Sequence, residues 1–441
     1  MPRKDCGSKW KEAGRRRSFS SGFPEQACKD FAIWDRIPTF LMKRRRFLGS
    51  VTGGALAGAV GVGNAAPQPT VPPLAGPLIK TPAVLMAPRA DGIEVVWAVG
   101  RLCRGWVEWK SADGATGKAS EDAFGFVPQG DRIVRVKVDG LKPGTAYQIR
   151  AVAESGDGEK AHEETEWKSF RSLDAKAAST TFVVWNDTHQ WNDTITALHQ
   201  APPKADFLLW NGDTCNDWSQ EDWLAPTLLH PGGQDVSDGR PMFVVWGNHD
   251  VRGKWAFRMP ELVATPSGRP YYAFRSGPVA FICLHTGEDK PDDHPSFGGR
   301  VAFEALRREQ AEWLKTVIAQ PEFRDAPYRV VFCHIPLRWT EEVPDAQYQK
   351  GGYDAFSRFS REAWHDSLVA WKTQMVISGH THETAFLPGN EKFPYAQLVG
   401  GGPKPEAATW IAGTADKSAL KFVMKDLSGK VVQNVSFKPL V

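Results

Sequence analysis

Two different patterns of hydrophobic positions follow one another along the chain. Between residues 81 and 174, hydrophobic and polar residues alternate over short runs, as in residues 92–97 and 132–138, and Gly, Pro and Asp separate the runs. Such alternation is typical of strands with one covered face, so we predict a small antiparallel β-sandwich. From residue 175 onward the hydrophobic runs are unbroken and predict strands covered on both faces: 182–185, 207–210, 243–246, 330–333 and 375–378.

One segment among these runs has the period of an amphipathic helix. Residues 302–319 carry a hydrophobic stripe formed by Leu306, Trp313, Leu314, Val317 and Ile318. The opposite, polar stripe is formed by Arg307, Arg308, Glu312 and Lys315. This spacing predicts a helix with one face against a sheet. Buried strands together with such a helix place residues 175–441 in the α/β class.

The first 80 residues follow neither pattern. Residues 42–65 begin with a basic run, continue with an uncharged stretch rich in Gly, Ala and Val, and end in small residues. That order predicts an export signal, and Arg44-Arg45-x-Phe47-Leu48 resembles the twin-arginine signals of bacteria. We therefore expect export to the periplasm or the extracellular space through the twin-arginine export machinery. Residues 1–41 would then be an upstream extension, and the Pro-rich residues 66–80 a linker.

Charge and composition narrow the class of protein. The 441 residues include 54 Lys and Arg against 51 Asp and Glu, but residues 1–66 alone carry a net charge of +8, which leaves −5 for the rest. A mildly acidic exported chain is not expected to bind nucleic acid. There is no run of about 18 hydrophobic residues and no cysteine directly after the signal, so we expect no stable membrane anchor. Cys283 and Cys333 lie in hydrophobic runs, where a buried free thiol is typical.

Each of the five unbroken hydrophobic runs is followed, within one to five residues, by polar residues that can bind a metal ion. The five clusters are Asp187-Thr188-His189, Gly212-Asp213-Thr214-Cys215-Asn216, Gly247-Asn248-His249-Asp250, His334 and Gly379-His380-Thr381-His382. Because α/β sheets bind ligands at the carboxyl ends of their strands, we expect these clusters to converge in space. Asp, His and Asn ligands without thiolates suit Mn, Fe or Zn.

In this order, the five clusters resemble the motifs of the calcineurin-like metallophosphoesterases. The resemblance covers about residues 180–441, and the sandwich in front resembles fibronectin type III domains, by residues 140–147, and the N-terminal domain of purple acid phosphatase-like members. It implies an α/β/β/α sandwich, in which a two-layered β-sheet core is flanked by helices, and two divalent or trivalent metal ions. The implied ligands are Asp187, His189, Asp213 and His382 for one ion and Asp213, Asn248, His334 and His380 for the other, with Asp213 as the bridge.

The resemblance also implies a mechanism. Two neighbouring metal ions neutralise the charge of a phosphoryl group and lower the pKa of a water, which becomes the hydroxide nucleophile. His249 is adjacent to the ligand Asn248 without being a ligand, and we predict that it is the general acid for the leaving group. Many family members orient this histidine with an Asp at the position of Asn216; here the neutral amide, or Asp217 or Asp250 in its place, would do so. The metal-bound Tyr of purple acid phosphatases is missing, so we expect a colourless enzyme.

Three further groups of residues each have a functional and a structural interpretation. Tryptophans at the ends of hydrophobic runs form either an aromatic floor for the substrate or part of the core: Trp185, Trp210 and Trp246. His285 and the acidic residues 288–293 are candidates for contacts with substrate or a further ion. Cations that follow the motifs either pair with phosphate or are solvated: Arg252, Lys254 and Arg338.

The predicted function is hydrolysis of small-molecule phosphomonoesters or phosphodiesters by an exported dinuclear-metal enzyme. Nucleotide or pyrophosphate hydrolysis is an alternative, because loops rather than metal ligands set the substrate in this family. An alternative of another class is a non-catalytic metal-binding surface module, derived from an enzyme that has lost its activity. Such a protein is expected to lack some metal ligands, but all the implied ligands are present. A nuclease is disfavoured by the charge of −5 and by export.

Overall fold

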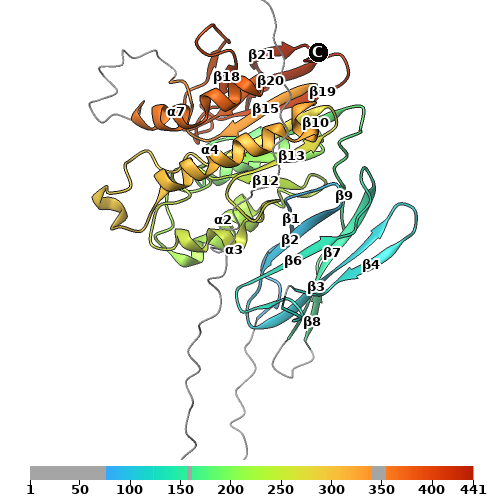
Figure 1. The fold of residues 1–441 in the computed structure, drawn as a ribbon. Helices are drawn as coiled ribbons and strands as arrows, with labels where there is room; N and C mark the ends of the chain where they lie inside the picture. The colour runs from blue at the N-terminus through green and yellow to red at the C-terminus, as the bar shows by residue number, and fades with distance from the viewer. Residues whose placement is uncertain (1–75, 123, 156–160, 340–353, 441) are drawn as a thin grey trace, which may run out of the picture. The chain divides into compact units, whose positions relative to one another are not determined.

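The computed structural model describes residues 76–122, 124–155, 161–339 and 354–440. The predicted upstream extension, the twin-arginine signal and most of the linker lie outside these residues. In the described part of the chain, two large β-sheets pack face to face and carry helices on their outer surfaces (Figure 1). The predicted α/β/β/α arrangement is therefore confirmed.

The first sheet has nine strands, and three of the unbroken hydrophobic runs form its centre. Its order is β21 (Val431–Phe437), β20 (Leu420–Asp426), β19 (Thr409–Ala415), β10 (Thr180–Trp185), β11 (Phe207–Asn211), β12 (Met242–Val245), β1 (Val84–Met86), β2 (Gly92–Ala98) and β6 (Ile133–Asp139). Strands β10, β11 and β12 run parallel, with Trp185 beside Trp210 and Trp210 beside Val244. Their carboxyl ends therefore lie at the same edge of the sheet.

The second sheet has six strands and contains the other two runs. Its order is β13 (Tyr272–Ser276), β14 (Val279–Leu284), β15 (Tyr328–Cys333), β16 (Met375–Ser378), β18 (Ala396–Val399) and β17 (Ala385–Leu387). Strands β14, β15, β16 and β18 run parallel. Aromatic rings fill the layer between the sheets, where the ring of Phe182 lies 5.1 Å from that of Phe281 and 6.3 Å from that of Phe332. Strands covered on both faces need no polar alternation, as the unbroken runs predicted.

Helices cover the outer face of each sheet (Figure 1). Those against the nine-stranded sheet are α1 (Asn192–Gln200), α2 (Leu224–Leu229) and α3 (Met259–Leu262), and those against the six-stranded sheet are α4 (Phe303–Ala319), α5 (Pro321–Arg324) and α7 (Asp354–Ala370). The described residues also form the 3-10 helices η1 (Glu221–Trp223), η2 (Pro231–Gly233), η3 (Ala256–Arg258) and η4 (Pro295–Phe297).

The helix predicted at residues 302–319 is confirmed as α4, and its Leu314 and Val317 are buried. Arg307, which the pattern placed on the polar stripe, is buried as well. Its guanidinium donates a hydrogen bond of 2.8 Å to the carbonyl of Thr286, in the loop after β14. The expectation of a polar stripe is therefore wrong at Arg307, because a tertiary hydrogen bond satisfies the cation inside the protein.

Residues 81–174 are all-β, as predicted, and their strands divide between two sheets. Strands β1, β2 and β6 extend the nine-stranded sheet, because β1 pairs in parallel with β12 at Met86 and Met242. The remaining strands form another sheet, in the order β4 (Thr116–Ala119), β3 (Cys103–Ser111), β7 (Ala146–Ser155) and β8 (His162–Glu164), with β5 (Gln129–Gly130) paired to β3 and β9 (Lys168–Arg171) to β7. Trp97, Val107 and Ile149 belong to the hydrophobic core between these layers. The sandwich is thus continuous with the sheet that carries three of the motifs.

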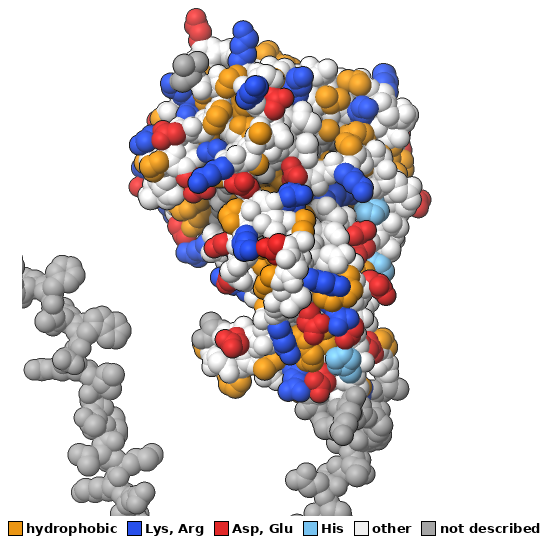
Figure 2. Space-filling view, turned by 90° about the vertical axis from the view of Figure 1, so that its right-hand side faces the viewer, with side chains coloured by type: hydrophobic (Ala, Val, Ile, Leu, Met, Phe, Trp, Pro, Cys, Tyr) orange, Lys and Arg blue, Asp and Glu red, His pale blue; other side chains and the backbone are white. Residues whose placement is uncertain are grey.

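One face of the surface carries charges of both signs (Figure 2), and the thiols agree with the sequence analysis. Figure 2 shows Lys and Arg side chains intermixed with Asp and Glu over the face that it presents, so charge of one sign is not concentrated there. The cysteines of the described residues are buried free thiols: Cys103, Cys215, Cys283 and Cys333. None of the helices in the described ranges combines the length and hydrophobicity needed to cross a membrane.

Candidate metal centre

The five motifs meet where the parallel strands of the two sheets end. The turns after β10, β11, β12, β15 and β16 carry, in this order, Asp187 and His189, Asp213, Asn248, His334, and His380 and His382. Five of these residues have a positive φ: Asp187 (49°), His189 (44°), Asp213 (51°), His380 (73°) and His382 (59°). A left-handed backbone conformation costs a residue other than glycine about 1 kcal/mol or more. Five such residues at one edge of the sheets therefore indicate a functional site.

Four of the side chains form a first cluster. One ligand atom from each of them lies within 4.8 Å of the others: Asp187, His189, Asp213 and His382. His189 Nε2 is 3.3 Å from Asp213 Oδ2 and 3.1 Å from His382 Nε2. His382 Nε2 is 3.6 Å from Asp187 Oδ1. Both carboxylates are buried, whereas the His382 side chain is 44% exposed, so the cluster opens to solvent on the side of His382.

Asp213 also belongs to a second cluster, with His334 and His380. His334 Nε2 lies 3.1 Å from Asp213 Oδ2, and His334 Nδ1 donates a hydrogen bond of 2.8 Å to the carbonyl of Asn211. That bond fixes the ring so that Nε2 faces the carboxylate. His380 Nδ1 lies 2.8 Å from Asn248 Oδ1, which brings Asn248 to the same cluster. Asp213 Oδ2 therefore faces both clusters, as a bridging ligand would.

Several buried polar atoms at this centre have no hydrogen-bond partner among the described residues. They include Asp213 Oδ2, His334 Nε2 and Asn248 Nδ2. The first two are 3.1 Å apart without the geometry of a hydrogen bond, although buried polar atoms are normally satisfied. Carboxylate oxygen and imidazole nitrogen are the donors that first-row metal ions bind. The side chains present therefore fit the two metal ions that the motifs imply.

The electrostatics of the centre favour a bound cation. Burial raises the pKa of Asp187 to about 7. Burial alone would lower the pKa of His334, but Asp213 and Asp187 outweigh it and raise this pKa to about 10. The two carboxylates thus stabilise positive charge between them, which a metal ion supplies in place of a proton. Burial lowers the pKa of His380 to about 3 and that of His382 to about 4, which keeps both imidazoles neutral, as ligation requires.

Two glycines of the motifs let the backbone approach the carboxylates. A Cβ atom on Gly247 would lie 2.2 Å from Asp213 Oδ1, and one on Gly379 would lie 2.2 Å from Asp187 Oδ2. The close approach allows Asp213 Oδ1 to accept a hydrogen bond of 2.9 Å from the amide of His249. Any larger residue at either position would displace a carboxylate, which is why the glycines accompany the ligands in the motifs.

His249 lies beside the first cluster without belonging to it. Its ring centroid is 4.7 Å from that of His189, and its Nδ1 donates a hydrogen bond of 2.6 Å to the main-chain carbonyl of Asn216. The Asn216 side chain instead contacts His189, with Oδ1 3.0 Å from Nδ1. The prediction that the side-chain amide of Asn216 orients His249 is therefore wrong about which atom of Asn216 makes the contact. The carbonyl orients His249, and the side chain leaves Nε2 of His189 free for a ligand.

Asp250, the other candidate to support His249, has a different role. Its buried carboxylate accepts hydrogen bonds from the amide and hydroxyl of Thr214, at 3.0 and 2.5 Å, and from the amide of Gly247, at 2.8 Å. These bonds tie the turn after β11 to the turn after β12. Asp217 accepts a bond from the amide of Ser219. In the described part of the chain no carboxylate pairs with the His249 ring, so Asp250 is a structural residue and the prediction is wrong for it.

The second nitrogen of His249 faces a cation. Arg252 Nη1 lies 2.9 Å from His249 Nε2, and the guanidinium is held by Glu288 at 2.6 Å and by Asp289 at 2.8 Å. Burial lowers the pKa of His249, and Arg252 acts in the same direction. The sequence pointed to Arg252 and to residues 288–293 separately, but no local pattern joins residues 36 positions apart. The structure joins them in one network.

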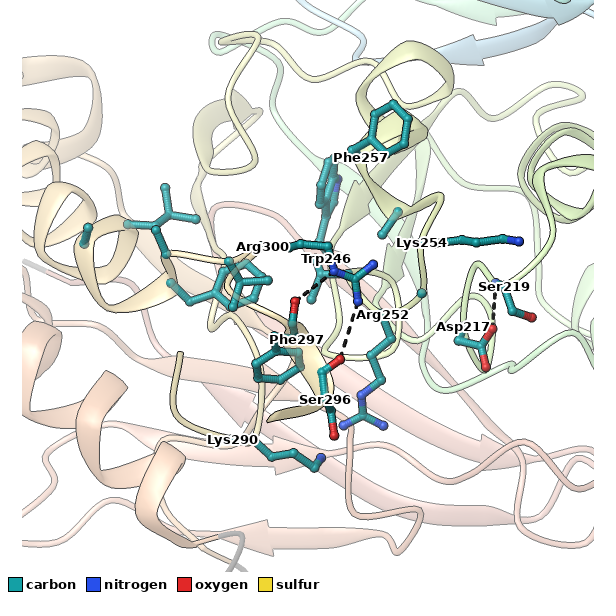
Figure 3. A pocket seen from close by; sticks show the side chains of 18 of the residues that line it. Asp217, Ser219, Trp246, Arg252, Lys254, Phe257, Lys290, Ser296, Phe297 and Arg300 are labelled. Atoms are coloured by element: carbon teal, nitrogen blue, oxygen red, sulfur yellow. Dashed lines mark hydrogen bonds between the residues drawn. The ribbon is translucent and has the colours of Figure 1, made fainter. Parts of the chain in front are cut away.

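A cavity of about 820 Å³ opens beside Arg252 (Figure 3). Its lining includes four aromatic and four basic side chains: Trp246, Phe257, Phe297 and Phe303, and Arg252, Lys254, Lys290 and Arg300. Trp246 therefore borders open space, as an aromatic floor would. Trp185 and Trp210 are fully buried with ring centroids 6.1 Å apart, so they belong to the core. No pattern in the sequence indicated Arg300 or Phe303 as cavity residues, because they lie far from the motifs.

Two other candidates have structural roles. His285 is buried, with its ring 5.8 Å from that of Trp246 and 5.5 Å from that of Phe303. Arg338 is buried and donates hydrogen bonds to main-chain carbonyls, including that of Pro388 at 2.9 Å. The interpretation of these two side chains as substrate contacts is therefore wrong.

The fold and the centre together define a class of protein. Residues 180–384 match the family model of the calcineurin-like phosphoesterases. With the two-layered sheet core and the paired Asp and His clusters, this match identifies the region as a calcineurin-like metallophosphoesterase domain, as the motifs predicted. The chain is a metal-dependent phosphoesterase.

Relatives of known name or structure agree with this class. The chain is 24% identical over 254 residues to the serine/threonine-protein phosphatase CPPED1 of Pongo abelii (54% of this chain, 77% of that protein) and 25% identical over 243 residues to that of Homo sapiens (51% and 73%). The structure resembles purple acid phosphatase PPD1 of yellow lupin (Lupinus luteus) with a TM-score of 0.63 and 15% identity, over 82% of this chain and 74% of that chain. It resembles PhoD with a TM-score of 0.55 and 14% identity, over 82% and 93%. At these identities the two structures show the common fold.

Proposed function

We propose that the chain is an exported dinuclear-metal phosphoesterase that hydrolyses small-molecule phosphomonoesters or phosphodiesters. The observation that carries the proposal is the position of Asp213 between two ligand clusters. Its Oδ2 atom lies 3.3 Å from His189 Nε2 and 3.1 Å from His334 Nε2 and has no hydrogen-bond partner among the described residues. A shared, otherwise unsatisfied carboxylate oxygen is what a two-metal site requires of its bridging ligand.

The residues proposed to hold the ions are those of the two clusters. They are Asp187, His189, Asp213 and His382 for one ion and Asp213, Asn248, His334 and His380 for the other. When bound, the two cations supply charge neutralisation for the phosphoryl group and an activated water. The mixed oxygen and imidazole donors support Mn, Fe or Zn.

His249 is proposed to give a proton to the leaving group. The Asn216 carbonyl holds its Nδ1, so Nε2 is the atom available for proton transfer. Arg252 donates to Nε2 in the structure, and because a guanidinium can only donate, this contact belongs to the neutral imidazole. To act as the acid, the imidazole must first take up a proton from solvent at Nε2, which breaks the contact with Arg252. A guanidinium at this place can also stabilise the negative charge of a phosphoryl group.

The test is hydrolysis of an aryl phosphomonoester and an aryl phosphodiester by the full chain loaded with Mn, Fe or Zn, with His249→Ala beside the wild type. We expect turnover to fall by about 10²- to 10⁴-fold in the variant, because a general acid is lost. The metal content should stay unchanged, because His249 belongs to neither cluster. The matched control is His162→Ala, whose imidazole is 47% exposed on β8, and it should keep both turnover and metal. Full turnover in His249→Ala would contradict the assignment.

Export is proposed from the sequence of residues 42–65, which lie outside the described residues. The pair Arg44 and Arg45 is its most specific feature. Replacing both with Lys in the full-length chain should keep the protein in the cytoplasmic fraction of the producing bacterium, whereas the wild type should reach the periplasm or medium. Equal distribution of the two chains would argue against the twin-arginine route.

A further inference from the structure

The cavity of about 820 Å³ is connected to the metal centre through His249, which contacts the lining residue Arg252. Arg252 lines the cavity and reaches His249 Nε2 at 2.9 Å. Asp217 also lines it and directly follows Asn216, whose carbonyl holds Nδ1 of the same ring. His249 thus stands between the ligand clusters and the cavity. Because a general acid must reach the oxygen that departs, the leaving group of a substrate lies on this side.

One wall of the cavity is aromatic (Figure 3). Trp246 is half-buried, and Phe257 on η3 is 67% exposed. Phe303, at the start of α4, is half-buried and also lines the cavity. A cavity of this volume with aromatic walls and a few polar groups is typical of sites for organic ligands. Inorganic phosphate would leave such a wall uncovered.

Two cations of the lining, Arg300 and Lys254, are available to pair with an anionic ligand. Arg252 is paired with Glu288 and Asp289, and Lys290 is paired with Asp289. Arg300 donates hydrogen bonds only to carbonyls, that of Phe297 at 2.8 Å and that of Ser296 at 3.4 Å (Figure 3). In the described ranges, no carboxylate pairs with Arg300 or with Lys254, another cation of the lining. An anionic group can therefore bind here without competing with an internal partner.

We propose that this cavity holds the leaving group of the substrate and selects phosphoesters whose leaving group is a flat aromatic body with a second anionic group. The inference rests on the proposed function. The aromatic body lies along Trp246 and Phe257, and the second anion pairs with Arg300, while the ester phosphate is at the metal centre. Arg300 and Phe257 are thus specificity-determining residues, because they contact the part of the substrate that is not cleaved.

The test compares three monoesters on the full, metal-loaded chain: phenyl phosphate, 2-naphthyl phosphate and 6-carboxy-2-naphthyl phosphate. We expect KM to fall in this order, with about a tenfold step for the carboxylate, since one charge-assisted hydrogen bond is gained. Arg300→Gln should remove that step, so that the KM values for 2-naphthyl phosphate and 6-carboxy-2-naphthyl phosphate become about equal. Its control is Arg308→Gln, at a guanidinium 73% exposed on α4.

A second pair of variants tests the aromatic wall. Phe257→Ala should raise KM for both naphthyl esters by about tenfold, a larger increase than for phenyl phosphate, because a large contact of the second ring is lost. The control is Phe126→Ala, which removes a ring 61% exposed in the sandwich region. Equal KM values for the three esters, together with indifference to Arg300→Gln, would overturn the inference while turnover of phenyl phosphate still upheld the proposed function.

Absence of any metal-dependent turnover would instead contradict the proposed function. In that case a binding measurement tests the cavity independently of turnover. The probe is 6-hydroxy-2-naphthoate, the departing group itself, titrated calorimetrically into the full chain. Binding that weakens about tenfold in Arg300→Gln and is unchanged in Arg308→Gln supports the cavity as an anion-selective aromatic site. No binding, or equal binding to both variants, overturns it.

Discussion

Two histidines directly follow neighbouring strands at equivalent positions, yet only one belongs to the metal centre. β14 and β15 pair in parallel with Leu284 opposite Cys333, so His285 and His334 follow at the same level of the six-stranded sheet, and both are buried. Burial lowers the pKa of His285 to about 3. For His334 the carboxylate of Asp213, together with that of Asp187, outweighs burial, and the pKa rises to about 10.

The difference shows that a histidine's position at the end of a parallel strand does not by itself make it a metal ligand. His334 faces two carboxylates contributed by the other sheet, whereas the ring of His285 faces Trp246 and Phe303. The same residue type is therefore prepared for a cation in one place and kept neutral in the other. The carboxylate of Asp213, which follows β11, accounts for the difference between the two histidines. Removing that carboxylate is therefore the strongest test of the comparison.

The largest effect is expected from Asp213→Asn. The substitution keeps the shape of the side chain but removes the charge that both clusters share. We expect turnover to fall by about 10³-fold or more and at least one metal ion per chain to be lost, because the bridging ligand positions both ions. Metal analysis and kcat/KM for an aryl phosphoester measure the two effects on the same sample.

Asp206→Asn is the matched control, because Asp206 directly precedes the amino end of the same strand, β11. Its carboxylate accepts a hydrogen bond of 2.7 Å from the amide of Thr181, away from the motifs. The control should keep two metal ions and full turnover. Two bound ions and undiminished turnover in Asp213→Asn would remove the physical basis of the difference between His334 and His285.

The strands and the ligands could be predicted because both depend on local sequence. A buried parallel strand needs an unbroken hydrophobic run, and the residues that follow it lie at its carboxyl edge whatever the rest of the fold does. This is why Asp213 and His334 were found from short runs of sequence. Strand β1 is an exception to this rule. It is followed by Ala87, which has a φ of 49°, but it ends at Met86, opposite Met242 at the start of β12. Its turn therefore does not reach the edge.

The remaining assignments could not be predicted because they depend on which atom of a residue faces which neighbour. Asn216 was identified correctly as a neighbour of His249, but its carbonyl rather than its amide makes the contact. Arg252 and Glu288 meet only after two loops have folded together. His285 and His334 both follow a hydrophobic run, and nothing in the sequence around His285 indicates that its ring packs against Trp246.

The smallest expected effect, and one that sharpens the comparison, comes from His285→Gln. The pKa of His285 is lowered by burial from 6.5 to about 3. Above pH 6.5 the imidazole is neutral in the folded and unfolded states, and its contribution to stability is fully present. Below pH 6.5, His285 is protonated in the unfolded chain but stays neutral in the folded chain. The free energy of unfolding therefore declines by about 1.4 kcal/mol per pH unit until the pH reaches the folded pKa.

Glutamine cannot take up this proton, so His285→Gln should lose less stability on acidification than the wild type. Between pH 7 and pH 5 the difference in the free energy of unfolding should amount to about 2 kcal/mol, measured by urea unfolding of both chains. All other titrating groups, including His334 and its carboxylates, are common to the two chains and cancel in the difference. Parallel pH dependences would show that burial does not hold His285 neutral. Full metal content and turnover in the same variant would establish that His285 contributes to the fold without serving the metal centre. Among the described residues, no carboxylate faces its ring.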